Sequence, residues 1–215
     1  KENLLDQAIT LLALERYQDA LDIFYNITDN IDREDEDSWH GYALSLHKLG
    51  RFQDAMTSYN VSLQLNSTDA SIWKDKGDLL FDMGSYEESL NAFERAIQLS
   101  PSYADAWYGK GDALSRINRL DESLICFNKC IEIDSSNAAA WNNKGATLVL
   151  MGRYDVGLSC YDEAINRTSD YAIPWSNRAE ALLFLGRINE AFNSSNKSLE
   201  LNPNSAFAWL INEKA

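Results

Sequence analysis

The sequence predicts an all-α protein built of tandem helix-turn-helix hairpins, and three observations carry that prediction. Each tryptophan follows the previous one by 34 residues, an interval that fits two helices of about 13 residues joined by short turns. A small residue and a leucine then follow at fixed distances, and a glycine or asparagine closes the first helix. The six tryptophans are Trp39, Trp73, Trp107, Trp141, Trp175 and Trp209.

The first helix of each repeat, helix A, carries one packed stripe. With tryptophan numbered as position 4, small residues occupy position 8 and leucines position 11. At about 100° per residue these positions share a narrow arc, so we expect the stripe, tryptophan included, to face the core. Position 15 favours a left-handed backbone that ends the helix, and it is occupied by Gly50, Gly84, Asn118, Gly152 and Gly186.

The second helix, helix B, opens with an apolar or aromatic residue and continues through a small residue three positions later. An aromatic residue commonly comes four positions after that, which again gives one helical face. In five repeats these aromatic positions are Phe24, Tyr59, Phe93, Phe127 and Tyr161.

The repeats divide the whole chain, 1–215, as one solenoid. The first repeat departs from the pattern with Leu4 in place of tryptophan and one extra residue, which we place in the acidic connection 32–37. The seventh repeat stops after helix A, and Glu213 stands at its small position, so a capping helix or a truncated repeat is expected there. The predicted segments are 1–35, 36–69, 70–103, 104–137, 138–171, 172–205 and a terminal helix, 206–215.

Composition excludes several classes of function. A net charge of −14 repels phosphate backbones, so nucleic acid is not an expected partner. No apolar run approaches the roughly 18 residues of a membrane span. The three cysteines, Cys126, Cys130 and Cys160, are odd in number and favour a reducing, cytoplasmic location, although an exported one stays open. Cys130 stands where a small buried residue is expected.

Residues 85–101, SYEESLNAFERAIQLSP, together with the tryptophan and small-residue columns, resemble the tetratricopeptide repeat (TPR) family. The resemblance covers essentially the whole chain, and the Trp-x-x-Lys-Gly segments of the middle repeats are similar to arrays from archaea. It implies a right-handed α-solenoid whose A helices line a concave groove that binds proteins or peptides.

Positions 2, 5, 9 and 12 of helix A lie away from the packed stripe, and we call them the A-helix stripe. Its middle is acidic with interleaved aromatic residues, and its C-terminal part is apolar. We therefore expect a protein or peptide partner with basic and apolar anchors. The candidate binding residues are His40, His47, Lys74, Asp78, Phe81, Asp105, Tyr108, Asp112, Asn142, Val149, Glu180 and Leu183.

Other ligands fit the sequence less well. The carboxylate clamp of the TPR family is disfavoured, because Asp78 stands where its asparagine should be and repels an anion. His40 and His47, about 10 Å apart along one helix, are interpreted as surface residues rather than metal ligands. A cationic column at position 7, Lys76, Lys110, Lys144 and Arg178, is interpreted as stems that cover apolar surface.

No phosphate loop, nucleophile elbow or His-carboxylate arrangement appears, so no catalytic residue, metal or cofactor is predicted. The leading hypothesis is a non-enzymatic protein-interaction scaffold. The alternatives are a self-associating structural array and the targeting module of a larger enzyme outside this segment.

Overall fold

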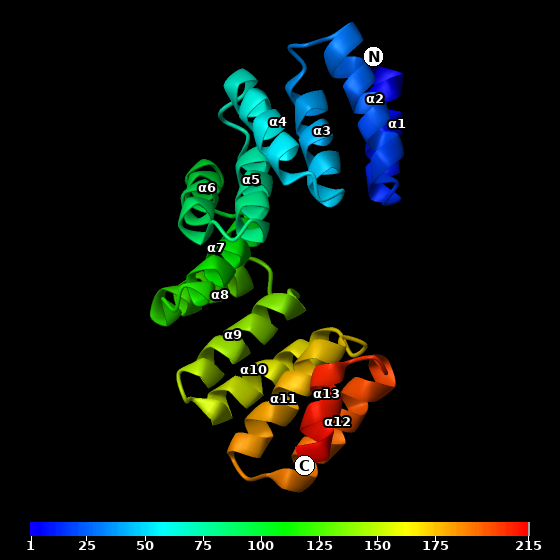
Figure 1. Cartoon of the computed structure of the whole chain (residues 1–215). Coiled ribbons are helices and arrows are strands. Elements are labelled where there is room, and N and C mark those ends of the chain that lie inside the picture. Colours follow the sequence, from blue (N-terminus) through cyan, green and yellow to red (C-terminus); the bar gives the residue numbers. More distant parts are fainter. Residues whose placement is uncertain (215) are drawn as a thin grey trace. The chain divides into compact units, whose positions relative to one another are not determined.

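The computed structural model describes residues 1–214, and all of the regular structure in that range is helical (Figure 1). The all-α prediction is therefore confirmed. The helices are α1 (Glu2–Ala13), α2 (Tyr17–Asn26), the π-helix η1 (Ile27–Ile31), α3 (Glu36–Lys48), α4 (Phe52–Leu65), α5 (Ala70–Asp82), α6 (Tyr86–Leu99), α7 (Ala104–Arg116), α8 (Leu120–Ile133), α9 (Ala138–Leu150), α10 (Tyr154–Arg167), α11 (Ala172–Phe184), α12 (Ile188–Leu201) and α13 (Ala206–Lys214).

The chain divides into two compact units, residues 1–109 and residues 110 onward, and the boundary in the sequence falls within α7. Odd-numbered helices are the A helices and even-numbered helices the B helices. In the first unit α1, α3 and α5 each pack on the B helix that follows, and α2 and α4 pack on the next A helix. In the second unit α9 and α11 pair with α10 and α12, and α8, α10 and α12 pack on the A helix that follows.

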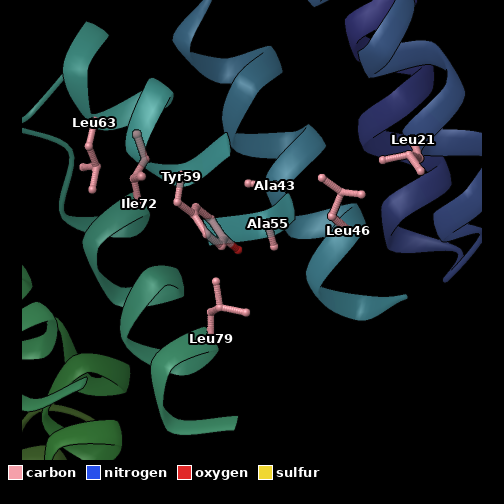
Figure 2. Close-up of a cluster of buried hydrophobic side chains, with 8 residues drawn as sticks. All are labelled: Leu21, Ala43, Leu46, Ala55, Tyr59, Leu63, Ile72 and Leu79. Carbon is pink, nitrogen blue, oxygen red and sulfur yellow. The ribbon is translucent and has the colours of Figure 1, made fainter. Parts of the chain in front are cut away.

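The buried core of the first unit confirms the predicted stripe. Eight side chains from α2, α3, α4 and α5 form one cluster, in which Ala43 and Leu46 stand at positions 8 and 11 of α3 (Figure 2). Tyr59, the predicted helix B aromatic of α4, is fully buried in this cluster. Packing of successive hairpins thus buries apolar surface that one hairpin would leave exposed.

Aromatic side chains of B helices insert against glycines of A helices. A methyl group at Gly77 of α5 would lie 2.7 Å from Cε1 of Phe93, and one at Gly109 of α7 would lie 2.4 Å from its Cζ. In the second unit a methyl group at Gly111 would lie 2.9 Å from Cε1 of Phe127. These glycines therefore allow the rings to approach the A helices closely, because any side chain in their place would meet a ring.

The predicted helix ends are confirmed. All four glycines at position 15 have positive φ, and Asn118 takes the same conformation at φ 62°. The structure adds Glu15 at φ 57°, which ends α1 without a glycine or an asparagine. The sequence pattern missed this residue because a left-handed glutamate has no signature of its own.

The prediction that the extra residue of the first repeat lengthens the acidic connection is wrong. The connection covers residues 32–35, four residues like the equivalent 66–69 after α4. The insertion lies instead in helix B, whose C-terminal turn becomes η1. A π-turn holds one more residue than an α-turn, and here it keeps Ile27 and Thr28 buried.

The assignment of the tryptophans to the buried core was partly wrong. The first five are half-buried, and Trp209 in α13 is 52% exposed. In five repeats the indole nitrogen donates to a backbone carbonyl six residues earlier, for example from Trp107 to Pro101 at 2.9 Å. The tryptophan therefore ties the turn between repeats to helix A, whereas the Trp175 nitrogen is buried without a protein acceptor.

Candidate functional site

The A-helix stripe in the first unit begins with two histidines that are not surface residues. Nε2 of His40 lies 2.8 Å from Asp75, and Nε2 of His47 lies 2.8 Å from Asp82. His40 is half-buried, and His47 is 5% exposed with its ring against Phe52. The interpretation as exposed histidines was wrong, because each ring connects α3 to α5.

Sequence reasoning missed Asp75 and Asp82 although a signal was present. Each aspartate stands 35 residues after its histidine, which is one repeat plus one residue. Successive A helices place such positions side by side. The same spacing joins Asn142 of α9 to Asn177 of α11, whose side chains hydrogen bond at 3.0 Å.

A cluster of charges occupies the middle of α5. Nζ of Lys74 lies 2.9 Å from Asp78 and 3.2 Å from Asp75. Burial lowers the pKa of Lys74, but the two carboxylates outweigh it and hold that pKa above its usual range. Burial also opposes ionisation of Asp75, yet His40 and Lys74 keep the pKa of this carboxyl low. The positive charge of Lys74 is therefore already balanced by carboxylates of the protein itself.

Asp78 is the partly exposed member of this cluster, with 38% of its side chain accessible. Burial raises the pKa of its carboxyl, and Lys74 offsets only part of that effect. The ionised carboxylate is thus incompletely compensated, because Lys74 is shared with Asp75.

The remaining predicted residues of the first unit differ in burial. Phe81 is half-buried with its ring 5.3 Å from that of Tyr86, Tyr108 is half-buried and Asp105 is exposed. Tyr103, which the sequence did not single out, lies close enough for Lys74 to act on the pKa of its hydroxyl, which burial raises.

In the second unit Asp112 repeats the situation of Asp78. Its side chain is 26% exposed, and the nearest cation, Arg116, is 3.9 Å away. Burial raises the pKa of Asp112, and Arg116 only partly opposes that rise. Asp112 is therefore a second incompletely compensated carboxylate on the A-helix stripe.

The C-terminal part of the stripe is less accessible than predicted. Asn142 is 3% exposed, and its amide is used by Asn143 and Asn177. Val149 and Leu183 are half-buried and pack against the core cluster around Leu158 and Tyr161. Glu180 is half-buried. The structure thus places Asn142 in the framework rather than at a surface.

Three residues of the cationic column at position 7 have contacts that confirm its interpretation as structural. Lys76 and Lys144 lie over the rings of Trp73 and Trp141, at 5.4 and 5.0 Å from the ring centroids. Arg178 donates to Asp162 of α10. The three cysteines are buried thiols, and Cys130 is the small hydrophobic residue expected at its position.

Within residues 1–214 no group of three or more His, Cys, Asp or Glu side chains could hold a metal ion. Over the same range, none of the helices has the length and apolar character needed to cross a bilayer.

Helical hairpins with inserted aromatic residues and glycine-ended A helices define the class of the protein, an α-solenoid repeat protein. Sequence models of the TPR repeat and tetratricopeptide repeat match residues 5–70, 77–118, 104–137, 126–155 and 174–205. The chain therefore belongs to the tetratricopeptide repeat family. A comparison with curated proteins finds no match.

Solved structures share the fold at low sequence identity. The chain is similar to the APC/C hetero-tetramer Cut9-Hcn1, with a TM-score of 0.87 and 16% identity over 98% of this chain and 42% of that one. It is similar to pilF of Pseudomonas aeruginosa, with a TM-score of 0.85 and 15% identity over 100% and 97% of the two chains. YrrB, described as a TPR protein with an unusual peptide-binding site, gives a TM-score of 0.66 and 20% identity over 87% and 95%.

Proposed function

We propose that the chain is a non-enzymatic protein-interaction scaffold whose A-helix stripe binds a partner segment with basic and apolar anchors. The observation that carries this proposal is the pair of carboxylates Asp78 and Asp112, one in each unit. Both are partly buried on the stripe, and burial raises the pKa of each.

A cationic anchor fits these carboxylates for an electrostatic reason. Each has lost part of its hydration, while the nearest cation is shared in the case of Asp78 and 3.9 Å distant in the case of Asp112. A lysine or arginine from a partner restores the missing compensation, so that Coulomb attraction offsets the burial of both charges. A partner anion would meet repulsion at the same place.

Apolar anchors can contact two half-buried rings on the A-helix stripe of the first unit. Phe81 stands three residues after Asp78 on α5, which is nearly one helical turn, and Tyr108 lies on α7. Aromatic rings of this kind give large contact area at a small cost in side-chain entropy. The peptide-binding site named for YrrB supports a peptide ligand on this fold.

Selection of binders from a random peptide library displayed on phage tests the proposal. The enriched peptides should combine lysine or arginine with apolar residues, and their affinity should fall about tenfold, or about 1.4 kcal/mol, on Asp78→Asn or Asp112→Asn. Asp121→Asn, an exposed aspartate of α8, is the control and should bind as the parent does. Enriched peptides without cations, or affinities that both substitutions leave unchanged, would contradict the proposal.

Self-association is a second candidate because α13 exposes a group of large apolar side chains. Phe207, Trp209 and Leu210 are all at least 40% exposed on this helix. Light scattering between about 10 µM and 1 mM protein would detect copies that cover it. A mass that stays at 24.3 kDa over that range argues against this candidate.

The proposal also covers a role of this scaffold within a larger protein and the class of its partner. The chain spans 42% of the Cut9-Hcn1 chain that it resembles, so a role as the targeting module of a larger protein fits the same fold. The charge of −14 favours protein over nucleic acid as the partner, since nucleic-acid binding depends on neutralising phosphates.

A further inference from the structure

A second groove lies on the other side of α5, away from the A-helix stripe. It encloses about 590 Å³ between α4, α5 and α6, and Met56, Trp73, Lys76, Met83 and Arg95 are among its lining residues. Three lining residues of α5 and Met83, which directly follows this helix, occupy positions 4, 7, 11 and 14. At 100° per residue their mean direction is about 160° from that of the A-helix stripe. The two surfaces are therefore separate.

Two cations of this groove are bound only to neutral groups. Nζ of Lys76 donates to the amide oxygen of Asn60 at 2.8 Å, and Arg95 donates to the amide oxygen of Gln98 at 3.2 Å. Burial lowers the pKa of Lys76, and the more distant Glu88 only partly opposes this. The charge of Lys76 is therefore partly dehydrated without a carboxylate in contact.

In two later repeats the equivalent positions have carboxylates. Arg178, three repeats after Lys76 in the position 7 column, donates to Asp162 at the place of Asn60. Lys129 and Lys197, which stand at the place of Arg95, bind Glu132 and Glu200 at the place of Gln98. In the repeat of Lys144 the equivalents of Asn60 and Gln98 are the neutral Asn128 and Asn166, and the equivalent of Arg95 is Glu163. Among these repeats, this groove therefore combines two cations whose hydrogen-bond partners are both neutral amides.

The rest of the groove is suited to an apolar side chain. Met56 and Trp73 are half-buried, Met83 is 37% exposed and Leu80 lies beneath them. Methionine side chains adapt their shape to different apolar groups, and the indole adds a broad flat surface. Glu88 is the one acidic residue among the lining residues, against the two cations.

We propose that this groove is a binding site for an acidic peptide segment of a partner protein, with an apolar side chain against Trp73 and carboxylates on Lys76 and Arg95. Charge complementarity supports this occupant, because a carboxylate that meets the two cations replaces neutral amides as their partner. The site differs from the A-helix stripe in both its place and the charge of its ligand.

Nuclear magnetic resonance of the six indole N–H groups tests the site with a defined probe. The probe is the capped pentapeptide Glu-Leu-Glu-Phe-Glu, and Lys-Leu-Lys-Phe-Lys is its matched control. The acidic peptide should shift the Trp73 signal, identified with Trp73→Phe, in a saturable way and more weakly at high salt. About 1 mM peptide half-saturates a site with a Kd of 1 mM. A Trp73 signal that does not move at that concentration overturns the proposal.

A charge variant separates the site from a general effect. Asn60→Asp with Gln98→Glu installs the carboxylates of the later repeats at two exposed positions, so the fold is retained while the affinity should fall at least tenfold. Asp162→Asn, the reverse change beside Arg178, should leave the Trp73 response unchanged. The proposal would be overturned if the double variant binds the acidic peptide as tightly as the parent does, or if the lysine peptide also shifts the Trp73 signal. Self-association that the double variant abolishes would overturn it too, because a second copy of the chain would then be the occupant.

Discussion

Because Phe93 inserts against Gly77, we expect Gly77→Ala to destabilise the parent protein but to stabilise the Phe93→Ala variant. Phe93 is 1% exposed, so Phe93→Ala should lower the free energy of unfolding by about 3–5 kcal/mol. A methyl group at Gly77 would lie 2.7 Å from Cε1 of Phe93, an overpacking that costs about 1–3 kcal/mol. The better helix propensity of alanine offsets about 1 kcal/mol of that cost.

Without the ring, the same methyl group enters vacated space. Gly77→Ala should therefore destabilise the parent protein by up to about 2 kcal/mol but stabilise the Phe93→Ala variant by about 1 kcal/mol, from helix propensity. The double variant then shows a favourable coupling of about 1–3 kcal/mol. The four proteins of this cycle are compared by urea denaturation, followed by circular dichroism.

Gly111→Ala provides the matched control, since its methyl group would meet Phe127 in the second unit. Its effect should be the same with and without Phe93. Additive effects of Gly77→Ala and Phe93→Ala, with no change of sign, would refute the conclusion that close approach is the reason for glycine at position 8.

Three further predictions concern stability. Because burial raises the pKa of Asp112, the folded protein binds this proton more tightly than the unfolded chain, and the resulting stability is lost as pH rises above the ordinary pKa of about 3.9. Asp112→Asn should therefore raise the melting temperature at pH 7 but not at pH 3. An equal change at both pH values would contradict this. Trp141→Ala should cost about 2–4 kcal/mol in urea melts and Trp209→Ala at least 1 kcal/mol less, because Trp209 is 52% exposed, so equal losses would argue against the role given to burial. Glu15→Gly should stabilise the protein by about 1 kcal/mol, since glycine adopts a φ of 57° without strain, and a lower melting temperature would show that the glutamate side chain matters more.

Much of the fold could be predicted because its causes are local. Gly50 and Asn118 end helices through their own backbone preferences, and Leu46 is buried through a 34-residue pattern that repeats along the chain. The organisation of 1–215 as a single solenoid of six repeats and a terminal helix stays a prediction, since the structure describes two compact units.

The candidate site was less predictable because it depends on pairs of residues. His40 stands on the A-helix stripe as expected, yet Asp75, on the next A helix, makes it part of the framework. Asn142 is buried for the same reason, through Asn177. The accessible residues of the stripe, Asp78 and Asp112, follow from the pattern, and their binding role stays a proposal.

The sequence by itself determined the all-helical hairpins, the ends of the five A helices that have glycine or asparagine at position 15, and the small residues at position 8, because periodicity and backbone preference act within one repeat. Only the tertiary structure decided that the extra residue forms the π-turn η1, that the first five tryptophans are half-buried, that five of the six tie a turn to helix A, and which charges are compensated. These outcomes depend on distances between side chains of different helices. A charge such as Lys76 can be judged only with its neighbours, because Asn60 and an aspartate differ in charge while filling the same place.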